Sequence, residues 1–156
     1  MKRIILLAAT HLAALGAGFG LGVYFLPIII EEDAPDAVVL EQAKKDASYS
    51  VALTRELRGS DALHWGEGEM SIAPRQISHR GELAPGPNYK LYLTKQFVEH
   101  EDEFEPIKSQ AALVGDIRSF DGFLLEVPSS IDIEDYNTAV IWCERFGEFI
   151  TAVQYR

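Results

Sequence analysis

Cysteine and histidine are scarce in this chain: one cysteine, Cys143, and four histidines occur among 156 residues. Because a disulfide needs two cysteines, the chain cannot close one internally. In an oxidising compartment a lone thiol is buried, bonded to another molecule or used chemically. Basic residues are also few, with 14 Lys and Arg against 24 Asp and Glu, for a net charge of −10. Phosphate backbones repel such a chain, so no nucleic-acid partner is expected.

Recognisable catalytic motifs are missing as well. The sequence has no Gly-x-Ser-x-Gly elbow, no His-Glu-x-x-His zinc motif, no phosphate-binding glycine loop and no dinucleotide fingerprint. These absences leave hydrolytic and nucleotide-dependent catalysis without support. The sequence therefore favours a protein that is not an enzyme, although the question stays open.

Charge is absent from Ile4 to Ile30, after Lys2 and Arg3. Because about 20 apolar helical residues cross a bilayer, residues 1–30 predict a transmembrane signal anchor that contacts lipid through residues 4–30. The basic start predicts a single pass through the cytoplasmic (inner) membrane, with the N-terminus inside and the C-terminal domain periplasmic or extracellular. A cleaved signal peptide is the alternative, but its apolar region is shorter, about 7–15 residues, and ends in a small-residue cleavage site.

Four glycines lie within this apolar run at every second position: Gly16, Gly18, Gly20 and Gly22. They form two overlapping Gly-x-x-x-Gly pairs, which let two membrane helices approach closely. One interpretation is a transmembrane homodimer. The other is that glycine is simply common in membrane helices.

Residues 31–48 are acidic and predict a short stalk or linker, with a helix over Ala37–Lys45 that Asp36 could cap. From residue 49 to 156, short apolar runs alternate with turn residues, which predicts an antiparallel β-sandwich. The expected strands are Tyr49–Leu57, Ala62–Ile72, Gln76–Leu83, Tyr89–Thr94, Leu113–Ile117, Phe123–Val127, Ala139–Cys143 and Phe149–Tyr155. The segment Phe97–Ser109 is either helix or loop.

The expected strand Ala139–Cys143 is apolar on both faces, with Cys143 on one face and Trp142 on the other. A strand of this kind is usually central and covered on both sides. The segment Arg145–Gly147 predicts a tight turn into the last strand. Cys143 should therefore lie at a strand end, beside that turn.

Several motifs in this region together resemble a known family. They are Gly86-Pro87-Asn88-Tyr89, Trp142-Cys143-Glu144, the His64 to Gly68 segment, and Val127-Pro128 with Ile131, Asp132 and Tyr136. Over about residues 55–156 the chain resembles the DM-thirteen domain, an electron-transfer family related to DOMON-like β-sandwiches. The resemblance implies a β-sandwich fold. It also implies a role in redox chemistry or electron transfer for the signature cysteine, which matches Cys143.

Two interpretations of Cys143 remain open. A redox thiol needs thiolate character, which Arg145 could promote, with Trp142 and His64 as further supporting residues. In the other interpretation the thiol is a small buried hydrophobe of the core.

Haem or metal binding is implied only by analogy with some DOMON-like domains. The candidate ligands are His64, Met70, His79 and His100. Their spacing fits no metal motif, so we expect no metal site and leave the cofactor unknown.

The leading hypothesis is a membrane-anchored, extracytoplasmic accessory domain with a redox or electron-transfer role centred on Cys143 and a protein redox partner. The alternative is a non-catalytic binding or scaffolding module in which Cys143 belongs to the core.

Overall fold

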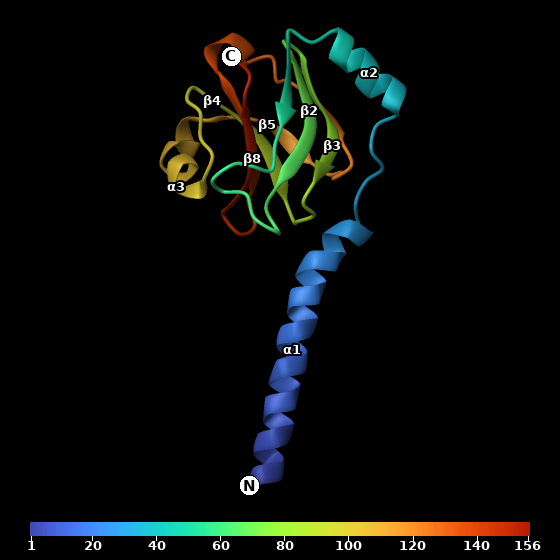
Figure 1. The fold of residues 1–156 in the computed structure, drawn as a ribbon, viewed down its shortest axis with the longest axis vertical. Helices are drawn as coiled ribbons and strands as arrows, with labels where there is room; N and C mark the ends of the chain where they lie inside the picture. The colour runs from blue at the N-terminus through green and yellow to red at the C-terminus, as the bar shows by residue number, and fades with distance from the viewer.

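The structure, a computed structural model, describes residues 1–156 as a long helix followed by a β-sandwich (Figure 1). Helix α1 (Lys2–Ile29) is long and apolar enough to cross a membrane. Because it lies near the N-terminus, a signal sequence would have the same length and composition. The apolar helix predicted from the sequence is therefore present.

The sandwich consists of two antiparallel four-stranded sheets, in the orders β1-β2-β3-β6 and β5-β4-β7-β8. The strands are β1 (Tyr49–Leu53), β2 (Gly66–Ala73), β3 (Gln76–Leu83), β4 (Tyr89–Thr94), β5 (Ala112–Ile117), β6 (Phe123–Glu126), β7 (Thr138–Cys143) and β8 (Glu148–Gln154). The helices after α1 are α2 (Ala37–Lys45), α3 (Glu101–Phe104) and the 3-10 turns η1 (Glu105–Gln110) and η2 (Ile133–Asp135). This architecture confirms the predicted fold class.

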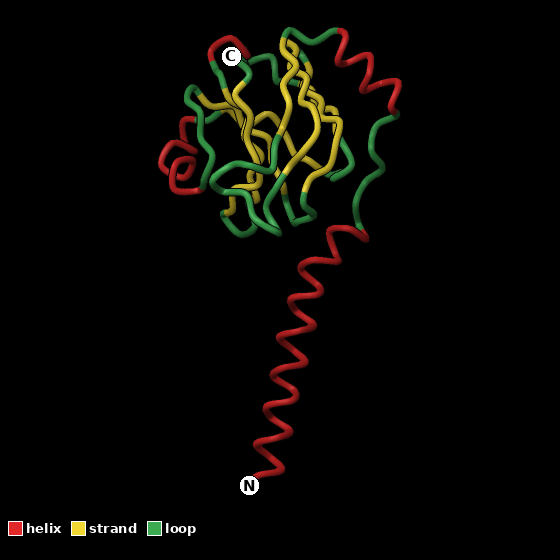
Figure 2. Tube along the Cα trace, viewed as in Figure 1, coloured by secondary structure: helices red, strands yellow, loops and turns green.

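All eight predicted strands are present, and the bounds of β3 and β4 agree with the prediction. The predicted extension of β1 to Leu57 and the predicted start of β2 at Ala62 are wrong. A loop joins β1 to β2 instead (Figure 2). Its cause is Asp61, whose carboxylate accepts hydrogen bonds from the backbone N–H groups of Leu63 and His64 and turns the chain there.

Strand β7 lies in the centre of its sheet, and all six of its residues are buried. One face packs into the main core between the two sheets. The other face contributes to a second apolar cluster, made of Tyr92, Val98, Phe104, Val140, Trp142, Phe149 and Ala152. The segment α3–η1 supplies Phe104 to this cluster, so the Phe97–Ser109 region contains short helices. The prediction of a central strand covered on both sides is confirmed.

Helix α2 occurs where the sequence predicts it, and it packs against the sandwich. Its own residues Leu40 and Ala43 are buried against the sandwich. Its Lys44 forms an ion pair of 2.7 Å with Glu69 on β2. The predicted side-chain cap is wrong, because the Asp36 carboxylate makes no cap hydrogen bond. Part of the acidic segment after α1 thus lies on the domain surface.

The chain that leaves α1 is fixed to the β5–β6 connection. Glu31 accepts hydrogen bonds from the backbone N–H of Phe120 and the hydroxyl of Ser119. Glu32 pairs with the guanidinium of Arg118 at 2.8 Å, and its own N–H donates to the Arg118 carbonyl. These contacts hold the C-terminal end of α1 beside one end of the sandwich.

Candidate functional site

Cys143 is the last residue of β7, and its side chain faces the core between the two sheets. Only 2% of the residue is exposed. The thiol donates a hydrogen bond to the carbonyl oxygen of Pro87, with an Sγ···O distance of 3.1 Å. The thiol is therefore placed at the strand end that the sequence predicts, but it is covered by the loop before β4.

Two segments distant in sequence meet at this thiol. Across the β4–β7 ladder, Tyr89 lies opposite Cys143. The N–H of Glu144 donates to the carbonyl of Asn88 at 3.0 Å, next to the contact between Cys143 and Pro87. The Gly-Pro-Asn and Trp-Cys-Glu motifs thus form one local structure. Pro87 and Asn88 each accept a hydrogen bond from the second motif through a backbone carbonyl.

Gly86 and Asn88 have backbone requirements that most residues would not meet. A Cβ atom on Gly86 would lie 2.7 Å from Cζ of the Tyr89 ring, which is closer than real Cβ contacts. Asn88 has a φ of 60°, in the left-handed region that asparagine tolerates better than most residues. The loop can therefore fold down over the sulfur, with the ring of Tyr89 packed under it.

Burial raises the pKa of the Cys143 thiol and is the largest influence on it. The backbone N–H groups of Phe146 and Arg145 lower this pKa, whereas the carboxylates of Glu148 and Glu144 raise it. The thiol is consequently protonated at neutral pH. From the sequence, Arg145 could promote thiolate character. In the structure it does so through its backbone N–H, which lowers the pKa of the thiol, while the residue itself is exposed.

Trp142 points to the opposite side of β7 from Cys143 and packs against Phe104, with ring centroids 5.0 Å apart. Its indole N–H is buried without a hydrogen-bond partner. The Lys108 ammonium lies 5.5 Å from the centroid of the indole ring. Trp142 therefore anchors the strand end from the side opposite the thiol.

The residue after the cysteine is held by two partners that the sequence analysis missed. The hydroxyl of Tyr92 donates to the carboxylate of Glu144, and Lys108 forms an ion pair with the same carboxylate at 2.7 Å. Burial is the largest single influence on Glu144 and raises its pKa, but the contacts with Lys108 and Tyr92 together outweigh it, so the pKa lies below its usual value. No sequence spacing signals these contacts, because β4, η1 and the end of β7 come together only in the folded domain.

The other candidate residues are dispersed. His64 lies before β2 and is 3.0 Å from Asp61, and His100 accepts a hydrogen bond from the N–H of Asp102 at the start of α3. Met70 and His79 oppose each other on β2 and β3, fully buried. No group of three or more His, Cys, Asp or Glu side chains is arranged to hold a metal.

His79 is a buried histidine that is only partly satisfied. Its Nε2 lies 3.0 Å from the Glu67 carbonyl oxygen, and its Nδ1 has no partner. Burial lowers the pKa of His79, since a charged ring in the core would lose its hydration. The ring is therefore neutral at pH 7 and packs against Phe123 as part of the core.

Comparison with known proteins agrees with this arrangement. No curated protein and no solved structure matches the chain significantly. The model of one family, described as electron transfer DM13, matches residues 56–155. That range contains both motifs that meet at Cys143. The chain therefore belongs to the electron transfer DM13 family.

Proposed function

We propose that the protein is a membrane-anchored, extracytoplasmic accessory domain of an electron-transfer system, with Cys143 as its redox-active group. Membership of an electron-transfer family supports the general role. The observation that carries the proposal for Cys143 is the convergence of the two motifs on its sulfur. Loop, strand and turn all contribute to the surroundings of this one atom.

The anchored topology rests on α1. Its only charged residues, Lys2 and Arg3, precede the apolar run, and acidic residues follow it. This order corresponds to an inside N-terminus and an outside domain. In a bacterial cell this arrangement would place α1 in the cytoplasmic membrane and the sandwich in the periplasm.

The chemistry that a lone cysteine offers is exchange with a disulfide of a partner. The Cys143 thiolate attacks one sulfur of the partner's disulfide, a mixed disulfide forms, and the other partner sulfur leaves as a thiolate. For this step the loop around Pro87 must move and expose the sulfur. Once burial is relieved, the N–H groups of Arg145 and Phe146 remain as donors that stabilise the thiolate.

The test is thiol trapping in cells that produce the full chain. Free thiols are alkylated at quenching, and disulfides are then resolved with and without reductant. We expect a reductant-sensitive intermolecular disulfide that disappears in Cys143→Ser. If every copy of Cys143 is alkylated as a free thiol, even after treatment of the cells with a thiol oxidant, the redox proposal is wrong.

A second candidate function is a non-catalytic binding or scaffolding module. The specific observation in its favour is that Cys143 is buried and its pKa is raised, as for a structural thiol. In this case the acidic surface would meet a basic partner. The same trapping experiment separates the two functions, since a scaffold would keep Cys143 free under oxidant.

We also propose that α1 forms a homodimer through its glycines. In one copy, Gly16, Gly18, Gly20 and Gly22 have no atoms near the position of an added Cβ. Gly16 and Gly20 lie on one side of the helix and Gly18 and Gly22 on the other, and each side is open to a second helix. An oligomerisation reporter should lose its signal for Gly20→Ile and keep it for Leu12→Ile, and equal signals for both variants would contradict the dimer.

A further inference from the structure

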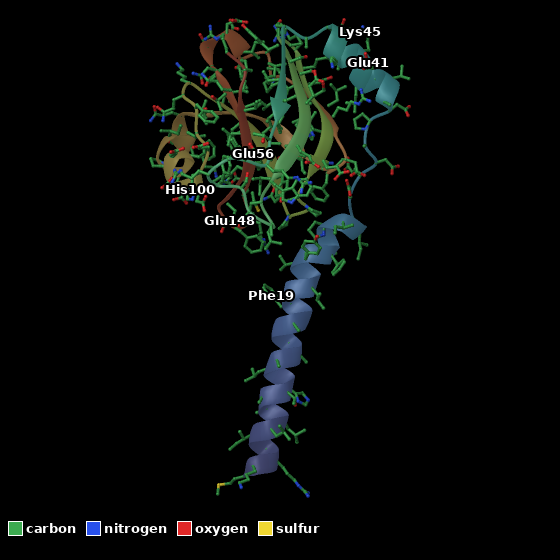
Figure 3. The ribbon with its side chains drawn as sticks, in the orientation of Figure 1. Phe19, Glu41, Lys45, Glu56, His100 and Glu148 are labelled. Carbon is green, nitrogen blue, oxygen red and sulfur yellow. The ribbon has the colours of Figure 1, made fainter.

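A cleft of about 960 Å³ lies between the C-terminal end of α1 and the nearest end of the sandwich. Figure 3 shows Phe19 on α1 below the domain and Glu148 at the domain end that faces the helix. Since Glu148 lies opposite Cys143 in the β7–β8 hairpin, the cleft is at the same end as the thiol. Its volume is in the range of small-molecule sites.

The two walls of the cleft differ in chemistry. The helix wall is apolar and consists mainly of Phe19, Val23, Phe25, Leu26, Ile29 and Ile30. The domain wall is formed by the loop around Pro87, the end of β5, and the turn that contains Arg145 and Phe146. If α1 spans a membrane, the apolar wall continues directly into the lipid, so an apolar ligand can enter from the bilayer.

The charges of the lining argue against an anionic ligand. They are three acids and two bases: Glu31, Glu32, Asp116, Arg118 and Arg145. Arg118 forms an ion pair with Glu32, and Asp116 forms an ion pair with Lys90 at 2.7 Å. The Glu31 carboxylate accepts two hydrogen bonds from the β5–β6 connection.

Arg145 is the exception among these charges. Its guanidinium forms no ion pair or side-chain hydrogen bond anywhere in the structure. Beside it, Phe146 leaves half of its surface exposed although it is a large apolar residue. A free cationic donor next to an exposed ring suits a flat, neutral head group that carries acceptor oxygens.

We propose that this cleft binds a membrane-soluble quinone with an isoprenoid tail. Its ring packs against Phe146, a ring carbonyl accepts a hydrogen bond from Arg145, and its tail follows the apolar side of α1 into the bilayer. A quinone meets the three requirements of the site: an apolar tail, no charge, and carbonyl oxygens on a flat ring. It is also a class of electron carrier, so the inference rests on the proposed anchoring and electron-transfer role.

The cleft and the thiol share one wall. Pro87 lines the cleft, and its carbonyl accepts the hydrogen bond of Cys143. An occupant of the cleft would therefore contact the loop that covers the sulfur. Binding of a quinone in the cleft requires neither the thiol nor its oxidation.

The test is calorimetric titration of the full-length protein, in detergent micelles, with decylubiquinone. We expect saturable binding that Arg145→Gln weakens about 10-fold, because one charge-assisted hydrogen bond is lost. Phe146→Ala should weaken binding several-fold. Arg75→Gln is the matched control, since Arg75 is exposed and lies outside the cleft, and it should bind as the wild type does.

Equal affinity of the wild type and Arg145→Gln, or no binding at all, would overturn the inference. Displacement of decylubiquinone by an equal concentration of phosphatidylglycerol would also overturn it and assign the cleft to a phospholipid. Cys143→Ser should bind decylubiquinone normally. If quinone binding fails while the Cys143 disulfide still forms in cells, only this inference is wrong. Binding without that disulfide contradicts the thiol proposal instead.

Discussion

The two sheets of the sandwich share one core but are covered differently on their outer faces. The outer face of β1-β2-β3-β6 carries small polar residues such as Ser71 and Ser78, against which α2 rests with two buried side chains. The outer face of β5-β4-β7-β8 carries a cluster with three large aromatic residues from its strands, Tyr92, Trp142 and Phe149, under α3–η1. The sheet that holds Cys143 is thus packed tightly from both sides.

Removing the aromatic anchor of the Cys143 sheet should have the largest effect. Trp142→Ala deletes a side chain that is 1% exposed, and we expect a loss of about 3–5 kcal/mol in the free energy of unfolding. Urea denaturation of the full chain measures it. Leu40→Ala, on the cover of the other sheet, should cost less. A larger loss of unfolding free energy for Leu40→Ala than for Trp142→Ala would contradict the comparison of the two sheets. Leu63→Ala is the neutral control, because Leu63 is exposed.

Gly86→Ala should disturb the loop above the thiol. The new Cβ would press on the Tyr89 ring, so we expect a destabilisation of about 1–3 kcal/mol and faster alkylation of Cys143 in the native state. Gly115→Ala is the matched control, since its Cβ would lie 3.7 Å from Leu125, an ordinary contact. If both variants alkylate at the wild-type rate, the loop does not control access to the sulfur.

The stability of the other sheet should depend on pH through His79. Its pKa is lowered in the folded state, so the unfolded chain binds the proton more readily. At pH values above about 6.5, the pKa of histidine in the unfolded chain, His79 causes no loss of stability. As the pH decreases below that value, the free energy of unfolding decreases by at most about 1.4 kcal/mol per pH unit. Denaturation curves between neutral pH and about pH 5.5 measure this slope. His79→Leu should flatten it, and Met70→Leu, which alters the opposing residue without removing a titratable group, should preserve it.

Local patterns predicted much of the fold. Alternation and turn residues located the strands, and the double apolar character of Ala139–Cys143 predicted a central, covered β7. The errors occurred where side chains act on a nearby backbone, as Asp61 does in the loop between β1 and β2. Asp36 shows the opposite case, a residue of the right type whose carboxylate makes no cap bond.

The site itself was predictable only as separate motifs. The hydrogen bond between the Cys143 thiol and the Pro87 carbonyl joins residues 56 positions apart, and it depends on the register of β4 against β7, in which Tyr89 lies opposite Cys143. The same register brings Tyr92 to Glu144, and η1 brings Lys108 to the same carboxylate. Packing of many side chains decides such long-range pairings, and no local sequence spacing encodes them.

The most direct test of the account is the alkylation rate of Cys143 in the folded full-length protein, compared with the rate in denaturant. The thiol is protonated, buried and covered by the Pro87 loop, so its reaction requires a local opening. We predict that native alkylation is slower than denatured alkylation by about 100-fold or more, and that Gly86→Ala narrows this gap. Equal rates in the native and denatured states would contradict the account.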